Sequence, residues 1–135
     1  MLVLSTPDKR IKYLSESYHG SCHDFRILKE EFPAERGQWF KDKRILLDSG
    51  FQGFVKEYGV RAAYLPKKKK AGCSLSEDEK VYNKALSSER IVVENAIGGM
   101  KRYRMLYHVV RCKDFRFYDE MAGVCAGLWN FNLDE

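Results

Sequence analysis

The first third of the chain contains two short β-prone runs followed by one helical pattern. Residues 2–6 and 10–15 are β-prone, and the segment between them contains a proline and an aspartate that suit a tight turn, so a β-hairpin is predicted. Residues 21–24 then have the form of a capping box, and apolar residues recur at helical spacing until Pro33. This second pattern predicts a short amphipathic helix.

The middle of the chain has the pattern of a strand, a helix and another strand. Residues 44–48 form a compact apolar run that ends in Asp48, as expected of a buried strand that leads into a tight turn. Apolar residues then repeat at helical spacing up to Gly59, a suitable C-cap, and residues 62–65 predict a strand that Pro66 ends. This order of elements favours a mixed α/β sheet.

Two longer helical patterns follow in the second half. A capping box at Ser76 and Glu79 begins a helix that we expect to run from about residue 77 past Val93. Residues 98 and 99 are both glycine, and each lowers helix stability by about 1 kcal/mol relative to alanine, so a kink or break is predicted there. A last helix is predicted over about residues 115–129, with apolar residues on one side.

Length and composition place the chain among ordinary globular domains. Its 135 residues fit a single domain, residues 1–135, that can fold without disulfides or a structural metal. No apolar run approaches the roughly 20 residues that cross a bilayer. The four cysteines form no C-x-x-C pair, which disfavours a zinc ribbon and a disulfide framework. We therefore expect a protein of the reducing cytoplasm, not of a membrane.

The net charge of +5 is concentrated in two basic clusters. Clustered cations attract phosphate backbones by releasing counterions, so nucleic acid is the first partner to consider. An ordinary basic surface is the alternative. The predicted DNA-binding residues of the two clusters are Lys67, Lys68, Lys69 and Lys70, and Lys101, Arg102 and Arg104.

One face of the long predicted helix carries charges of both signs. Arg90, Glu94 and Lys101 follow one another at helical spacing, which places them within a narrow arc. Such a face can hold a metal ion through the carboxylate and phosphate oxygens through the cations, but a surface ladder of salt bridges has the same spacing. Asp48 also has two interpretations: an acid at the rim of a sheet, where ligands usually bind, or a residue that starts a turn.

Six short motifs, in this order, make the chain resemble the DDE endonuclease domain of insertion-sequence transposases and their eukaryotic Harbinger-like relatives. The resemblance covers nearly the whole chain, and several weak motifs in the right order are far more specific than any one of them. The motifs are GSCHD at 20–24, LLDSGF at 46–51, AYLPKK at 63–68, YNK at 82–84, RIVVE at 90–94 and IGGMK at 97–101.

The resemblance implies a ribonuclease H-like α/β fold, a mixed sheet flanked by helices. In this fold the second catalytic acid ends a central strand and the third lies on a following helix, so by motif Asp48 and Glu94 take these catalytic and metal-binding roles. Many bacterial members carry the third acid in a pattern of Tyr, two residues, Arg, three residues, Glu, six residues, Lys. This chain has Arg90 and Lys101 at the matching positions, with Ser87 in place of the tyrosine.

The resemblance also implies Mg²⁺ or Mn²⁺ as cofactors and double-stranded DNA, at transposon ends, as the partner. Two such ions activate a water or a DNA 3′-hydroxyl and stabilise the leaving oxygen during attack on a phosphodiester. Hard cations of this kind prefer carboxylate oxygens. A zinc site made of His19, Cys22 and His23 is not expected, because the sequence offers no second cluster of ligands.

The first Asp of the family lies on a strand upstream of the segment with which this chain opens. Asp8 falls in the predicted turn and Asp24 belongs to the family's own His-Asp pair, so neither replaces it. His23 and Asp24 are interpreted as helix-capping residues. We therefore expect an N-terminally truncated domain that is inactive alone and that an upstream transposase fragment would complete.

These patterns together predict the C-terminal part of a DDE transposase, located in the cytoplasm and associated with the nucleoid if the source is bacterial. Its oligomeric state is left open. A degenerate gene copy, a second reading frame joined by frameshifting and a mis-assigned start are all compatible with the sequence. The alternatives are a non-catalytic DNA-binding or regulatory remnant of a transposase and a protein-interaction domain without a nucleic-acid role.

Overall fold

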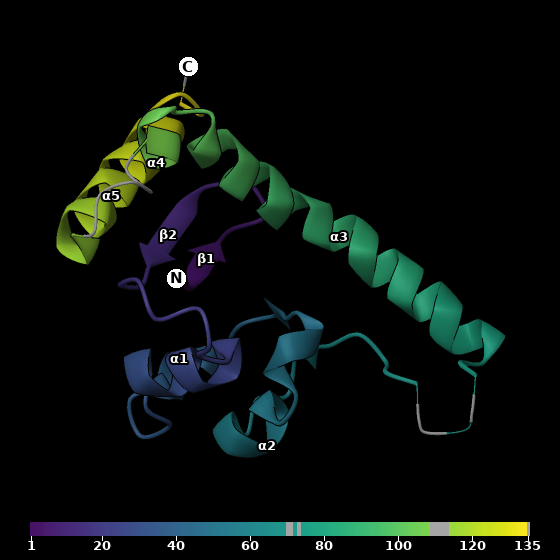
Figure 1. The fold of residues 1–135 in the computed structure, drawn as a ribbon. Helices are drawn as coiled ribbons and strands as arrows, with labels where there is room; N and C mark the ends of the chain where they lie inside the picture. Colours follow the sequence, from purple (N-terminus) through teal and green to yellow (C-terminus); the bar gives the residue numbers. More distant parts are fainter. Residues whose placement is uncertain (70–71, 73, 109–113, 135) are drawn as a thin grey trace. The chain divides into compact units, whose positions relative to one another are not determined.

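The computed structural model describes residues 1–69, 72, 74–108 and 114–134, and the chain forms two compact units (Figure 1). We call Ser21–Arg90 the central unit. The other unit joins Met1–Gly20 to Ile91–Glu135, and we call it the discontinuous unit. The long helix α3 (Glu77–Lys101) contributes residues to both. That residues 1–135 form a single domain stays a prediction.

The discontinuous unit begins with the predicted hairpin. Strand β1 (Val3–Ser5) pairs antiparallel with β2 (Ile11–Leu14). The turn is closed by backbone hydrogen bonds from Thr6 to the carbonyl of Arg10 and from Lys9 to the carbonyl of Thr6. Lys9 itself adopts a left-handed conformation with φ of 67°. The hairpin prediction is confirmed.

The last helix, α5 (Phe115–Phe131), begins where the pattern predicted. The carboxylate of Asp114 accepts hydrogen bonds from the first backbone N–H groups of the helix and so acts as its N-cap. One side of α5 packs into the core of the unit, where burial raises the pKa of the Cys125 thiol. The buried members of this core are Ile11, Ala96, Met100, Leu106, Ala122, Cys125 and Ala126, and the short helix α4 (Met105–His108) supplies one of them.

Polar side chains of α5 bind the N-terminal segment. The amide group of Asn130 pairs with the backbone of Ile11 in both directions: its Oδ1 accepts from the N–H at 2.8 Å, and its Nδ2 donates to the carbonyl at 2.8 Å. The indole N–H of Trp129 donates to the carbonyl of Lys9 at 2.9 Å. These bonds satisfy backbone groups that the two-stranded hairpin leaves unpaired.

Helix α3 confirms one prediction and corrects another. At its start, the hydroxyl of Ser76 accepts from the N–H of Glu79 while the Glu79 carboxylate accepts from the N–H of Ser76, which is the predicted capping box. The predicted break at Gly98 and Gly99 is wrong, because the helix continues to Lys101. The reason lies in packing: the indole ring of Trp129 occupies the space that a Cβ on Gly99 would need.

In the central unit, the predicted amphipathic helix is present as α1 (Asp24–Glu31). The capping box predicted over residues 21–24 is wrong. The N-cap is His23, which has an extended backbone and makes no side-chain cap hydrogen bond, so the helix begins too late for Ser21 to cap it. The interpretation of His23 as a capping residue is confirmed by its N-cap position, although its side chain makes no cap bond, and Asp24 is the first residue of the helix and not a cap.

An aromatic cluster forms the core of the central unit. Phe40 ends the 3₁₀ helix η1 (Gly37–Phe40), while Phe54 and Tyr58 belong to α2 (Phe54–Tyr58). The rings of Phe54 and Tyr58 stack with centroids 4.7 Å apart, and Phe40 meets both edge to face. Helix α2 ends at Gly59, a C-cap with φ of 60°, as predicted.

The predicted strands on either side of α2 are short. Strand β3 (Ile45–Leu46) pairs in parallel with β4 (Ala63–Tyr64), so a strand, helix and strand follow one another as expected. Within the described residues the strands form two separate two-stranded sheets, one in each unit. The chain is thus mixed α/β, and a single ribonuclease H-like sheet stays a prediction.

Replacing Gly99 by alanine tests the contact that lets α3 continue. We expect Gly99→Ala to lower the free energy of unfolding by about 1–3 kcal/mol, because the new methyl group must displace an indole ring held by its hydrogen bond to Lys9. The measurement is urea denaturation followed by circular dichroism.

Gly98→Ala is the matched control, since nothing lies within 4 Å of its would-be Cβ. This variant is expected to gain up to about 1 kcal/mol from helix propensity. Equal changes in the two variants would contradict the proposed role of the indole.

Candidate active site at the end of strand β3

Asp48 follows β3 after a single residue, and its turn-starting role is confirmed, while its role as a ligand-binding acid stays a prediction. It is the N-cap of the 3₁₀ helix η2 (Ser49–Phe51), where its Oδ1 accepts from the N–H of Ser49. The same oxygen pairs with Nη1 of Arg90 at 3.2 Å. The side chain is 51% exposed, so a ligand has access to the carboxylate from solvent.

Arg90 links this strand end to α3. Its side chain is 28% exposed, and its guanidinium reaches the carboxylate of Asp48 from the last α3 position in the central unit. Glu94 lies one turn further along the same helix, on an exposed position. Glu94 belongs to the discontinuous unit, so its convergence with Asp48 stays a prediction.

A second ion pair joins the other end of β3 to the same helix. Arg44, which precedes β3, pairs with Glu89 at 2.9 Å and lies over the ring of Tyr64 at 4.9 Å. Glu89 and Arg90 are consecutive on α3, so two neighbouring helix positions hold the two ends of one short strand. Sequence reasoning missed the Arg44–Glu89 pair, because no local spacing connects the two residues.

The His-Asp motif lies beside the turn that follows Asp48. An Oδ atom of Asp24 is 3.5 Å from the position that a Cβ on Gly50 would take. Two motifs that are far apart in the sequence, GSCHD and LLDSGF, therefore meet in the central unit. The signal for this contact was their shared membership of one family pattern, and residue spacing did not reveal it.

The first basic cluster is attached to α3 through the backbone of Lys67. The Asn83 side chain accepts from the Lys67 N–H at 2.8 Å and donates to its carbonyl at 3.0 Å. The Lys67 ammonium also lies over the ring of Tyr82, 5.8 Å from its centroid. Lys67, Lys68 and Lys69 are exposed in a segment without regular structure, as predicted, and Lys70 lies outside the described residues.

The second basic cluster is in the discontinuous unit. Lys101 ends α3, and Arg102 and Arg104 follow it, all three with exposed side chains. The guanidinium of Arg102 lies over the indole of Trp129, 5.7 Å from the ring centroid. Since the two basic clusters belong to different units, their union into one DNA-facing surface stays a prediction.

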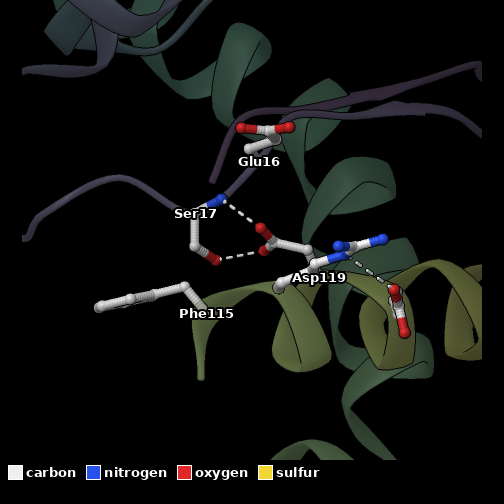
Figure 2. A pocket seen from close by; sticks show the side chains of 6 residues that line it. Glu16, Ser17, Phe115 and Asp119 are labelled. Atoms are coloured by element: carbon white, nitrogen blue, oxygen red, sulfur yellow. Dashed lines mark hydrogen bonds and ion pairs between the residues drawn. The ribbon is translucent and has the colours of Figure 1, made fainter. Parts of the chain in front are cut away.

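A separate hollow in the discontinuous unit lies between α5 and the segment after β2 (Figure 2). The carboxylate of Asp119 accepts from the Ser17 N–H at 3.1 Å and from its hydroxyl at 2.6 Å. Arg116 pairs with Glu120 along the helix at 3.4 Å. These contacts hold the segment against α5, and none of the predicted site residues lines the hollow.

A family model described as DDE superfamily endonuclease matches residues 1–130. The chain belongs to this family. It is also 31% identical over 115 residues to the probable transposase for insertion sequence element IS702 of Microchaete diplosiphon, a match over 84% of this chain and 39% of that protein. No solved structure matches the chain. The predicted family, and with it the identity as a transposase-type DDE domain, is confirmed.

DDE superfamily endonucleases generally depend on divalent metal ions. Asp48 and Glu94 fit such an ion, because each offers a solvent-accessible carboxylate. Among the described residues, no group of three or more His, Cys, Asp or Glu side chains is placed to hold a metal. In the same part of the chain, no helix is long and apolar enough to span a bilayer.

Removing the Asn83 side chain tests how the first basic cluster is held. In Asn83→Ala the backbone of Lys67 loses both of its described bonds to α3, so trypsin is expected to cleave after Lys67 to Lys69 several times faster. The measurement is the rate at which the corresponding fragments appear in a limited digest.

Ser87→Ala is the control, because its hydroxyl binds only within α3, to the carbonyl of Asn83. Cleavage at the same rate in all three proteins would show that Asn83 does not restrain the segment.

Proposed function

We propose that this chain forms part of the catalytic domain of a cut-and-paste DNA transposase and supplies two of its metal-binding carboxylates, Asp48 and Glu94. The observation that carries this proposal is the ion pair between Asp48 and Arg90. It attaches the acid at the end of β3 to α3 one helical turn before Glu94. Residues one turn apart on a helix have their Cβ atoms about 6 Å apart, so Arg90, the partner of Asp48, and Glu94 are neighbouring positions of α3.

The proposed arrangement is the ribonuclease H-like one, with an acid at a strand end and an acid on the following helix. Divalent ions, when bound, activate the attacking water or 3′-hydroxyl and stabilise the leaving oxygen. The chain itself would supply the carboxylates of Asp48 and Glu94 to hold them. Arg90 and Lys101, on the same helix, would position the phosphate that is attacked.

The family's third carboxylate, its first Asp in chain order, is proposed to come from an upstream segment. The chain spans 39% of the length of the curated transposase that it matches. With two carboxylates, the site is expected to bind metal weakly and to position it poorly, because each lost ligand removes both charge and geometry. Strand cleavage therefore requires the complete domain.

A plasmid-nicking assay tests this assignment. The chain with Mg²⁺ or Mn²⁺ is expected to leave supercoiled DNA intact, and the chain fused to an upstream transposase segment that carries the first Asp is expected to nick it. Asp48→Ala and Glu94→Ala should each lower the nicking rate of the fusion to the background rate, because each removes a metal ligand.

Asp78→Ala serves as the control, since Asp78 is an exposed acid in the first turn of α3. Robust nicking by the isolated chain that is lost in Asp48→Ala would show that the chain supplies the whole site itself. Nicking by the fusion that survives both substitutions would refute the metal-binding roles.

DNA binding is tested by a salt titration. Each phosphate contact contributes about 0.9 to the slope of log affinity against log salt, so Lys101→Ala should lower the slope by about 1. A variant with Lys67 to Lys70 all replaced by alanine should lower it further. Duplexes of unrelated sequence should behave alike, because backbone contacts carry no sequence information.

Lys56→Ala provides a control from outside both clusters, on an exposed position of α2. If all four proteins give one slope and one affinity, the basic clusters are a solvated surface. In that case a protein-interaction domain without a nucleic-acid role becomes the preferred hypothesis.

A non-catalytic, regulatory remnant of a transposase is the second candidate function. The observation that favours it is the structural role of Asp48, which caps η2 and pairs with Arg90. In that case the basic clusters still bind DNA, but the completed fusion does not nick it. The nicking assay and the salt titration together separate the two functions.

A further inference from the structure

The Asp48 carboxylate already has a cation beside it. Its Oδ1 accepts from the Ser49 N–H and lies 3.2 Å from Nη1 of Arg90. A guanidinium does not lose its proton in proteins, so this partner is a permanent cation. At 28% exposure, Arg90 is less accessible than Asp48, at 51%. Any ion that binds Asp48 therefore does so next to a fixed positive charge.

We propose that Arg90 is an internal countercation for Asp48, which weakens the binding of a divalent cation to this carboxylate until a DNA phosphate takes over the guanidinium. This inference rests on the proposed function, because it concerns Asp48 as a metal ligand. It assigns to Arg90 a positioning role that couples the metal to the nucleic acid.

Coulomb repulsion gives the size of the effect. A divalent cation and a guanidinium that share one carboxylate repel each other, and in a water-like dielectric this corresponds to about a tenfold loss of affinity. Since Asp48 is half exposed, the high dielectric is the appropriate one, and salt should screen the repulsion.

The guanidinium has a better partner in a phosphate. Its planar fork binds phosphate oxygens in a bidentate fashion and at shorter distances than the 3.2 Å that separates it from Asp48. A phosphate that draws Arg90 away leaves the carboxylate charge of Asp48 to the metal. By linkage, metal binding then strengthens DNA binding by the same factor. The divalent cation and the DNA phosphate therefore each bind more tightly when the other is present.

A purely structural role for Arg90 is the competing explanation, and the chain offers a matched control for it. Arg44 forms a similar pair with Glu89, the residue next to Arg90, and connects the same strand to the same helix. Arg44→Gln therefore removes an equal charge and an equal strand-to-helix link, but not the cation beside Asp48.

The experiment measures Mn²⁺ binding to the full chain without DNA, from the electron paramagnetic resonance signal of free Mn²⁺. At low salt, Arg90→Gln is expected to bind Mn²⁺ about tenfold more tightly than the wild type. Arg90→Lys, which keeps the charge, and Arg44→Gln are expected to stay within about twofold of it. The gain in Arg90→Gln should shrink at high salt and disappear when Asp48→Asn is added.

The outcomes separate this inference from the proposed function. A folded Arg90→Gln variant that binds Mn²⁺ no more tightly than the wild type overturns the inference, while loss of binding in Asp48→Asn still supports the metal role of Asp48. If Asp48→Asn changes binding in neither background, the metal role fails and the inference fails with it. Should Arg90→Gln not fold, Arg90→Met, which keeps the apolar stem, is measured in its place.

Discussion

The contact between Trp129 and Gly99 constrains the whole discontinuous unit. The indole lies against α3 at the one position where a side chain would exclude it, and its N–H binds the carbonyl of Lys9 in the hairpin turn. The guanidinium of Arg102 lies over the face of the same ring. One side chain of α5 thus contacts the hairpin, α3 and the segment after α3. A glycine that weakens the helix locally is what allows this packing, and tertiary contacts outweigh its propensity.

In the central unit, the ion pair between Asp48 and Arg90 is the contact that constrains the structure. A two-residue strand has little pairing of its own, and β3 is held at both ends by residues that neighbour each other on α3. Exposed ion pairs are individually weak, typically below about 1 kcal/mol, so these contribute orientation more than stability. What they orient is the acid on which the proposed metal site depends.

The elements that local chemistry determines were predictable from the sequence, and those that distant contacts determine were not. The capping box at Ser76 and Glu79 and the glycine at the end of α2 require only neighbouring residues. The continuation of α3 through Gly99 depends on a tryptophan thirty positions later, so propensity alone predicted a break. The roles of Asp48 and Glu94 stay predictions, and they rest on the family motifs rather than on the local pattern. The partner of Asp48 could not be predicted, because no periodicity connects residue 48 with residue 90.

The pairing of Asn130 with the backbone of Ile11 joins residues 119 positions apart. During synthesis on the ribosome, the hairpin emerges long before the helix that satisfies its outer backbone groups. The central unit, whose residues are continuous, has all of its partners available earlier. Until α5 leaves the exit tunnel, β2 presents an unpaired edge of the kind to which other chains can add a strand. The hairpin is therefore exposed to aggregation in the interval between its own synthesis and the emergence of α5.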